Sequence, residues 1–296
     1  MDRIRELPAF QIDPRTHLGR VHYTVASLEK MVAFYRDLLG FRLLWQEGDS
    51  AGLGAGEREL LRLTQVDGAK RVRRTTGLYH TAFLLPTRWD LAHLVKRVLV
   101  SGAPIHGHSN HGTHLAFYLP DPEGNGIELA WDFPRDQWPM TPDGMYDIAR
   151  APRSGIDLEE LLAELERDAS PWEGLAPATV VGHVHLHVSS LNASRAFYHG
   201  VLGLDVTLDR DDFGALFVSA GGYHHHVGAN IWLGEGAPPA PPYATGLRSF
   251  TIVVPGRQEL DRLIGRLEEA QLPYEPQDEG VLVKDPSQIG VLLVAD

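Results

Sequence analysis

The hydrophobic and polar positions of residues 21–41 alternate at first and then adopt a helical period. In VHYTVASLEKMVAFYRDLLGF, apolar residues occupy every second position up to Val25, which is typical of a strand with one buried face. Apolar residues then recur with a period near 3.6 between Ser27, a frequent residue before a helix, and Gly40, a frequent residue after one. The pattern predicts a strand followed by an amphipathic helix.

The same pattern occurs again later in the chain. VHLHVSSLNASRAFYHGVLGL (184–204) aligns on 21–41 without a gap, and this alignment places His22 on His185. A second pattern of strand, turn and helix at 77–99 matches 246–268, and each copy continues to a strand behind an Asp-Pro turn. The chain therefore reads as four βαβββ modules, over 17–66, 77–131, 180–234 and 245–296.

Four such modules predict an α+β fold in which modules pair edge to edge into two curved-sheet domains. Taken in sequence order, residues 1–135 hold the first pair and residues 180–296 the second. A Pro-rich linker with one helix spans 136–179. The alternative is that the second and third modules pair across the linker. In either case the concave side of a curved sheet offers a cleft for a small ligand.

Composition limits the chemistry of that cleft. The net charge of −12 argues against a nucleic-acid or anionic-membrane partner, and no apolar stretch is long enough for a transmembrane helix. We therefore expect a cytoplasmic protein. The chain has no Cys but 15 His, so any metal must be held by His, Asp or Glu.

Two residues of the second module stand out as metal ligands. His80 and Glu128 lie among apolar neighbours in predicted strands, and an unpaired buried carboxylate is costly. The duplicate module keeps the pattern but has Ser249 and Leu292 at these positions. The third ligand is expected to be His185 or, as the alternative, His22. Two His and one carboxylate form the donor set of non-haem iron(II) oxygenases.

The segment HGTHLAFYLPDPEGNGIE (111–128) carries a family resemblance. Its His111, Phe117-Tyr118, Asp121-Pro122, Gly124 and Glu128 resemble the signature of extradiol ring-cleavage dioxygenases of the vicinal oxygen chelate superfamily. Ser109 departs from the residues usual two places before the His. The resemblance extends over nearly the whole chain and is nearest to the catechol 2,3-dioxygenase-like branch.

The resemblance implies an Fe(II) cofactor, or Mn(II) in some members, and a small aromatic diol and O₂ as substrates. It makes His80 and Glu128 ligands, and it makes His111 and Tyr118 groups that hydrogen-bond substrate or activated oxygen. It also implies an acid–base His on the last strand of the partner module. We further expect a homo-oligomer.

The run GGYHHHVGANIW (221–232) bears on which modules pair. If the second module pairs with the first, His22 completes the metal site; if it pairs with the third, His185 does. The third module also brings the three histidines, which favours His185. Strand alternation would place His224 and His226 on one face and His225 on the far side. The resemblance makes His226, which lies just before the apolar strand, the acid–base, with His224 as its companion.

Two other functions fit the same fold. A glyoxalase-like isomerase or lyase would use a different metal chemistry, but such sites tend to have two carboxylate ligands, and the third module offers no second buried Glu. A metal-free small-molecule binder would not need the pair of His80 and Glu128. We therefore expect an extradiol dioxygenase that opens a catechol-type ring.

Overall fold

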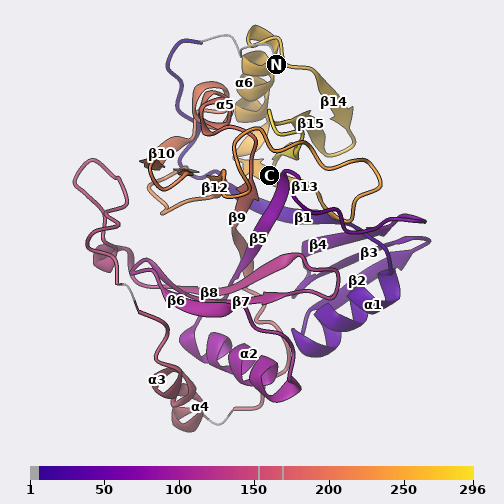
Figure 1. Ribbon diagram of the computed structural model, residues 1–296, viewed down its shortest axis with the longest axis vertical. Helices are drawn as coiled ribbons and strands as arrows, with labels where there is room; N and C mark the ends of the chain where they lie inside the picture. The colour runs from indigo at the N-terminus through magenta and orange to yellow at the C-terminus, as the bar shows by residue number, and fades with distance from the viewer. Residues whose placement is uncertain (1–6, 153, 169) are drawn as a thin grey trace.

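The computed structural model describes residues 7–152, 154–168 and 170–296 as two curved eight-stranded sheets (Figure 1). The strands of sheet I, in spatial order, are β10 (Asp205–Arg210), β11 (Ala215–Ser219), β12 (Val227–Asn230), β9 (Val180–His187), β5 (Gly77–Leu84), β8 (Gly126–Asp132), β7 (His114–Pro120) and β6 (Gly107–Asn110). Those of sheet II are β14 (Tyr274–Gln277), β15 (Gly280–Lys284), β16 (Gly290–Ala295), β13 (Gly246–Val254), β1 (His17–Val25), β4 (Arg58–Gln65), β3 (Ser50–Ala55) and β2 (Arg42–Glu47).

Each module contributes one principal helix. These helices are α1 (Leu28–Ala33) with its π-helical continuation η1 (Phe34–Leu38), α2 (Arg88–Ser101), α5 (Leu191–Arg195) with its continuation η3 (Ala196–Val201), and α6 (Gly256–Glu269). Ser27 and Ser190 cap α1 and α5 by accepting a hydrogen bond from the backbone N–H three residues on. The predicted α+β fold of four βαβββ modules is confirmed.

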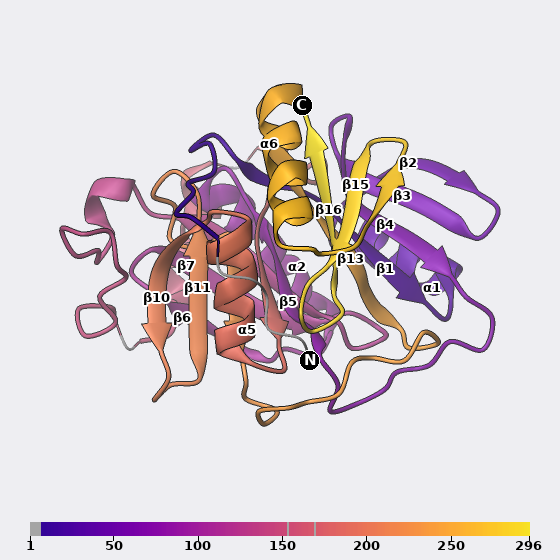
Figure 2. The same cartoon turned by 90° about the horizontal axis from the view of Figure 1, so that it is seen from above.

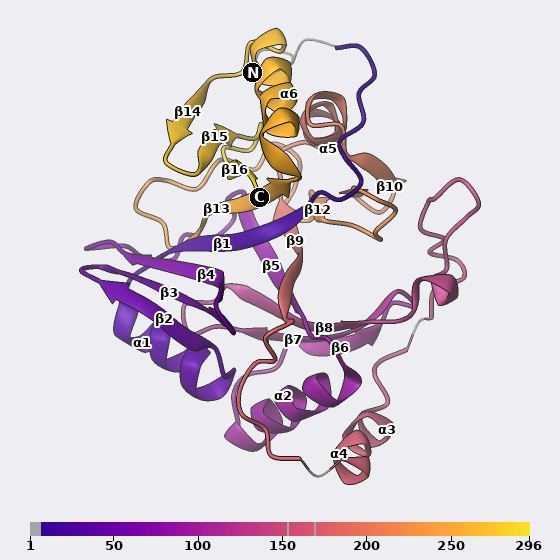
Figure 3. The ribbon, with the colours of Figure 1, turned by 180° about the vertical axis from the view of Figure 1, so that it is seen from behind.

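The sheets do not follow the sequence order of the modules. β5 pairs antiparallel with β9, so sheet I joins the second and third modules, whereas β1 pairs with β13 and joins the first and fourth. Figures 1 and 3 show β5 and β9 side by side at the centre of the molecule. The two halves of the chain, 1–135 and 180–296, therefore do not correspond to the two sheets, since each half contributes one module to each sheet. All four modules present an equivalent edge on their first strand, so the hydrophobic pattern does not distinguish between partners.

Hydrogen bonds also connect modules that are consecutive in sequence but lie in different sheets. The Tyr35 hydroxyl donates to Asp121 (3.1 Å), and at the repeated position the Tyr198 hydroxyl donates to Asp285 (2.8 Å). Each bond joins the helix of one module to the Asp-Pro turn of the next. The AFY and DP segments that repeat in the sequence are thus the parts that hold the two sheets together.

The remaining helices lie on the outside. The linker forms the 3₁₀-helix η2 (Arg135–Gln137) and, in place of one helix over 157–168, the two short helices α3 (Leu158–Leu162) and α4 (Glu164–Arg167). Both lie beside α2, where Arg88 approaches Glu160 (3.2 Å) (Figure 1). Figure 2 shows α5 and α6 next to each other, and Arg266 of α6 donates a hydrogen bond to the Val201 carbonyl at the end of η3 (3.2 Å). Within the described ranges no helix is long and apolar enough to cross a membrane.

Candidate metal centre and cavity

A cavity of about 690 Å³ lies on sheet I and is rich in imidazoles. Eight of the 15 histidines of the chain line it, together with Glu128 and Tyr118; they are His80, His106, His111, His114, His183, His185, His224 and His225. This concentration of buried titratable groups in one cavity marks it as the functional site.

Three of these side chains converge on one point. The Nε2 atoms of His80 and His183 lie 3.1 and 3.4 Å from Oε2 of Glu128, and all three residues are buried. His80 Nε2, His183 Nε2 and Glu128 Oε1 make no hydrogen bond with the part of the chain that the structure describes. Buried polar atoms without partners are costly, and a divalent cation held by the two imidazoles and the carboxylate would give both Nε2 atoms a partner.

The strand register explains why these ligands meet. Ala82 on β5 is paired with Glu128 of β8 on one side and with His183 of β9 on the other. Paired residues point to the same face of a sheet, and His80, two residues before Ala82, shares that face. The small side chain of Ala82 at the centre leaves the space in which the three ligand atoms converge.

The converging group contains His183, whereas His185 was the expected third ligand. His185 also lines the cavity, with its ring centroid 5.1 Å from that of His80, but it belongs to none of the groups whose ligand atoms converge. On β12 His185 is paired with Gly228, which has no side chain. A Cβ atom on Gly228 would lie 3.0 Å from Cγ of the His185 ring, so the ring occupies the space beside this glycine. The ring thus packs on β12 beside the converging atoms.

A signal for His183 was present in the sequence but was hidden by the alignment used. His80 stands seven residues before Thr87, the N-cap of α2, and His183 stands seven residues before Ser190, the N-cap of α5. Aligning the second module on the third by their caps would have placed His183 on His80. The gapless alignment of the first module on the third instead directed attention to His185, because the first module has Arg20 at the position of His183.

The alternative ligand, His22, lies in the other sheet. It sits on β1 opposite Ser249, and its Nε2 lies 2.8 Å from the Thr64 hydroxyl. Since the second module pairs with the third, His22 takes no part in the cavity on sheet I.

The three consecutive histidines are placed differently from the prediction. β12 begins only at Val227, so residues 224–226 lie in the irregular segment before it, and strand alternation does not apply to them. His224 and His225 line the cavity, whereas His226 does not and instead accepts a hydrogen bond from the Ala220 N–H (3.1 Å). The residue assigned to the far side, His225, is the one whose ring lies 4.1 Å from that of His183.

His111 and Tyr118 both reach the cavity and contact each other. The His111 Nε2 atom lies 2.8 Å from the Tyr118 hydroxyl, and Tyr118 is the cross-strand partner of Glu128. Burial lowers the pKa of His111 to about 3. Burial, with the charge of Glu128, also raises the pKa of Tyr118 well above its usual range. Both groups are therefore neutral near pH 7 and form a pair of hydrogen-bonding groups beside the carboxylate.

His114 is a residue that the sequence analysis missed. It opens β7 as a buried residue, and its Nε2 lies 3.0 Å from Glu128 Oε1. The signal was strand alternation, which puts His114 on the same face of β7 as Tyr118. His114, Asp132 and His224 also bring ligand atoms together. However, the rings of His114 and His224 are stacked at 14°, so their in-plane lone pairs are nearly parallel and do not meet at one ion.

The protonation states suit metal binding at the group of His80, Glu128 and His183. Burial opposes ionisation of Glu128, but the imidazoles of His183, His114 and His80 outweigh it and hold the pKa of Glu128 well below its usual value. Burial lowers the pKa of His183. An ionised carboxylate and a neutral imidazole are the forms that bind a metal.

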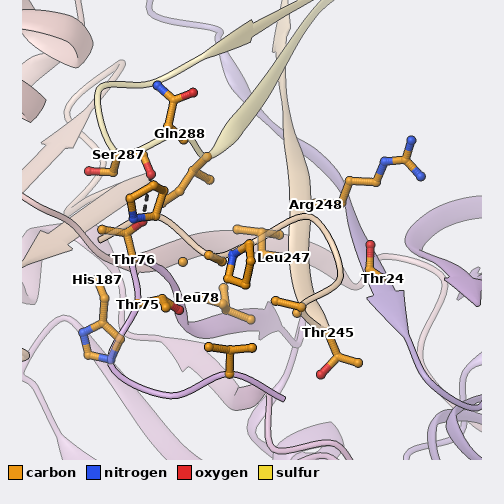
Figure 4. Close-up of a pocket in the computed structure, with 18 of the residues that line it drawn as sticks. Thr24, Thr75, Thr76, Leu78, His187, Thr245, Leu247, Arg248, Ser287 and Gln288 are labelled. Carbon is orange, nitrogen blue, oxygen red and sulfur yellow. Dashed lines mark hydrogen bonds between the residues drawn. The ribbon is translucent and has the colours of Figure 1, made fainter. Parts of the chain in front are cut away.

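A second cavity, of about 1050 Å³, has no such chemistry. Figure 4 shows it between the two sheets, with Thr24, Thr76, Arg248 and Ser287 among its labelled residues. Its only imidazole within the described chain is His187, whose Nδ1 lies 2.7 Å from the Asn230 side-chain oxygen. The chemistry of the lining, and not the size of the cavity, identifies the site on sheet I.

Comparisons with known proteins agree with this fold. Residues 17–129 and 180–287 match the family described as Glyoxalase/Bleomycin resistance protein/Dioxygenase superfamily. The chain is 42% identical to a catechol-2,3-dioxygenase of Bacillus subtilis (strain 168) over 92% of this chain and 94% of that protein. A solved structure from Bacillus subtilis subsp. subtilis str. 168 has a TM-score of 0.64 at 13% identity, covering 97% of this chain and 86% of that one. Glyoxalase I from Zea mays has a TM-score of 0.58 at 17% identity, covering 95% of this chain and 92% of that one.

The two segments that match the family, 17–129 and 180–287, together span most of the four modules. The chain therefore belongs to the Glyoxalase/Bleomycin resistance protein/Dioxygenase superfamily.

Proposed function

We propose that the protein is an extradiol dioxygenase, which opens a catechol-type aromatic ring with O₂ at the cavity on sheet I. The observation that carries the proposal is the buried convergence of His80, Glu128 and His183, in which neither imidazole Nε2 atom has a hydrogen-bond partner. The identity of 42% with a catechol-2,3-dioxygenase over nearly the whole chain supports the same activity.

The metal in this proposal is iron(II), with manganese(II) as the alternative. Two imidazoles and one carboxylate leave coordination positions open, as in non-haem iron(II) oxygenases. When bound, the metal supplies a centre at which a catecholate and O₂ exchange electrons. The overall reaction adds both oxygen atoms to the ring-opened product, so it needs no external reductant.

The side chains around the metal ligands handle protons and orientation. His111 and Tyr118, 2.8 Å apart, offer a neutral donor–acceptor pair to a diol or to reduced oxygen. We assign the acid–base role to His225 in place of His226, because His225 faces the cavity and packs on Phe217 (ring centroids 4.3 Å apart). Its Nδ1 lies 2.8 Å from Nδ1 of His224, so His224 keeps the companion role by fixing the orientation of His225.

The other two functions receive less support. The similarity to glyoxalase I concerns the fold alone, and the converging donor set has one carboxylate and two imidazoles. A metal-free binder would leave three buried polar atoms without partners. A small aromatic diol and O₂ as substrates, a homo-oligomeric assembly and a cytoplasmic location remain parts of the proposal.

Ring cleavage itself tests the proposal. Protein loaded anaerobically with iron(II) is mixed with catechol and then with air, while oxygen uptake and the visible spectrum are recorded. We expect one O₂ consumed per catechol and a yellow ring-opened semialdehyde. Glu128→Gln, which keeps the shape of the side chain but not its charge, serves as the matched control and is expected to lose activity. A colourless dicarboxylic acid, or no oxygen uptake at full iron loading, would overturn the proposal.

A further inference from the structure

The exposed part of the cavity lining is aromatic. Tyr79, Phe213 and Trp232 line it and remain 41%, 48% and 44% exposed, although most large hydrophobic side chains of the protein are buried. We call these three residues the aromatic rim. Exposed apolar side chains grouped at the mouth of a cavity mark a surface that is covered by a ligand.

The aromatic rim is fixed in place by its own contacts. The ring of Trp232 lies 5.3 Å from that of Tyr79 and 5.6 Å from that of Phe213, both at steep angles. The indole N–H donates to the Phe213 carbonyl (2.9 Å). Since its one polar atom is already satisfied, Trp232 presents only apolar surface to a ligand.

A single permanent cation reaches this cavity among the residues that the structure describes. It is Arg210, and its guanidinium donates two hydrogen bonds to the carboxylate of Asp212 (2.7 and 2.6 Å). This bidentate pair occupies the Nε–Nη2 edge of the guanidinium, the edge best suited to a carboxylate of a substrate. The one permanent cation of the described cavity is therefore already offset by a carboxylate.

From these contacts we infer that the site selects aromatic diols whose ring substituent is uncharged and apolar, and disfavours diols with a carboxylate. The inference rests on the proposed function, because it places the diol at the metal ligands and the substituent against the aromatic rim. The volume of about 690 Å³ leaves room for a substituent beyond the ring. A carboxylate placed there would lose hydration and would have to compete with Asp212 for Arg210.

Equilibrium binding without turnover tests the inference. Dissociation constants are measured by calorimetry under argon, on iron(II)-loaded protein, for catechol, 4-ethylcatechol and 3,4-dihydroxybenzoate; the last two carry substituents of similar size. We expect 4-ethylcatechol to bind at least about threefold more tightly than catechol, as expected for two buried carbon atoms. We expect 3,4-dihydroxybenzoate to bind at least about tenfold more weakly than 4-ethylcatechol.

Two variants with matched controls assign the effect. Asp212→Asn releases Arg210 and is expected to raise the affinity for 3,4-dihydroxybenzoate at least about threefold. Asp211→Asn makes the same charge change beside it but contacts Arg195 instead, and should not alter this affinity. Trp232→Ala should weaken 4-ethylcatechol at least about threefold, whereas Trp45→Ala in sheet II should not.

The outcomes separate the inference from the function on which it rests. If catechol is bound and cleaved but 3,4-dihydroxybenzoate binds as tightly as 4-ethylcatechol, the inference is wrong and the dioxygenase proposal stands. If Asp211→Asn and Asp212→Asn have equal effects, the assignment to Arg210 is wrong. If the iron-loaded protein neither binds nor cleaves any of the three diols, both proposals fail.

Discussion

For a single residue, the direction of a ring nitrogen determines its possible role more than its presence in the cavity does. Eight imidazoles line the cavity, but among the described residues only those of His80 and His183 converge with the carboxylate of Glu128 on one point and leave their Nε2 atoms without a hydrogen bond. Their rings are inclined by 69°, so their in-plane lone pairs can meet at one ion. The imidazoles of His111, His114, His224 and His225 are engaged with Tyr118, Thr113 or each other, whereas the Nε2 atom of His185 is also without a hydrogen bond but does not converge with the others.

A comparison of two adjacent histidines tests the acid–base assignment. We expect His225→Ala to lower kcat by about 10²–10⁴-fold, because general acid–base catalysis contributes effects of that size. His226→Ala, which removes an imidazole outside the cavity, should leave kcat within about threefold of the parent. Steady-state kinetics and metal content are measured for both. Equal losses of kcat at equal metal content would refute the assignment.

The residue scale is also where the sequence was least informative. His80, Glu128, His111 and Tyr118 were found from the repeat and the resemblance, and the structure brings all four to one cavity. The faces predicted for residues 224–226 are wrong because the sequence does not show where the strand begins. β12 starts at Val227, directly after the three histidines, so they do not alternate as strand residues.

Among the structural elements, the close contact between β5 and β8 positions the ligands. Gly126 opens β8 at a point where a Cβ would lie 2.0 Å from the Tyr79 carbonyl oxygen. No side chain fits there, so glycine lets β8 approach the strand that carries His80. Since Glu128 follows two residues later, this approach sets the separation between the two ligands.

Gly126→Ala is therefore expected to separate β8 from β5. We expect the free energy of unfolding to fall by about 1–3 kcal/mol, the usual cost of overpacking. We also expect the affinity for metal to fall, because Glu128 is displaced. The matched control is Gly265→Ala in α6, where a Cβ meets nothing within 4 Å. That change should stabilise the protein by about 0.5–1 kcal/mol. Urea denaturation and metal titration check both; an undisturbed metal affinity in Gly126→Ala would contradict this account of β8.

The elements were more predictable than the ligands. Strand alternation, helical period and the Ser caps were sufficient to define four modules, since these signals are local. The continuation of α1 as the π-helix η1 and the division of the linker helix into α3 and α4 depend on packing against other elements, which a local pattern does not contain.

In the whole molecule, the two sheets arise from modules exchanged across the linker, and buried groups hold them together. Buried imidazoles on both sheets are neutral: burial lowers the pKa of His22 in sheet II and of His226 beside sheet I to about 3 in each case. The choice of partner modules could be foreseen only from the distribution of histidines, because the strand edges are equivalent.

These buried histidines predict loss of stability in acid. Their folded pKa lies below the unfolded value of about 6.5, so the unfolded chain takes up protons first and stability is lost as the pH falls from about 6.5 towards 3. At pH 5 each contributes a loss of about 2 kcal/mol. Burial raises the pKa of Asp285 to about 6, which acts in the opposite direction between about pH 4 and 6.

Urea denaturation of metal-free protein at pH 7.5 and pH 5 checks this. His22→Gln, which can retain the hydrogen bond to Thr64, should reduce the drop in unfolding free energy by about 2 kcal/mol. An unchanged drop in this variant would show that His22 does not titrate as its burial requires.

If sheet I holds one metal ion between β5, β8 and β9, the iron content of the protein after anaerobic loading tests this most directly. We expect about one iron per chain in the parent and in His185→Ala, and less than about a tenth of that in His183→Ala. Loss of a ligand removes the metal site, whereas loss of a neighbouring imidazole does not. Full iron in His183→Ala, with loss in His185→Ala, would contradict it.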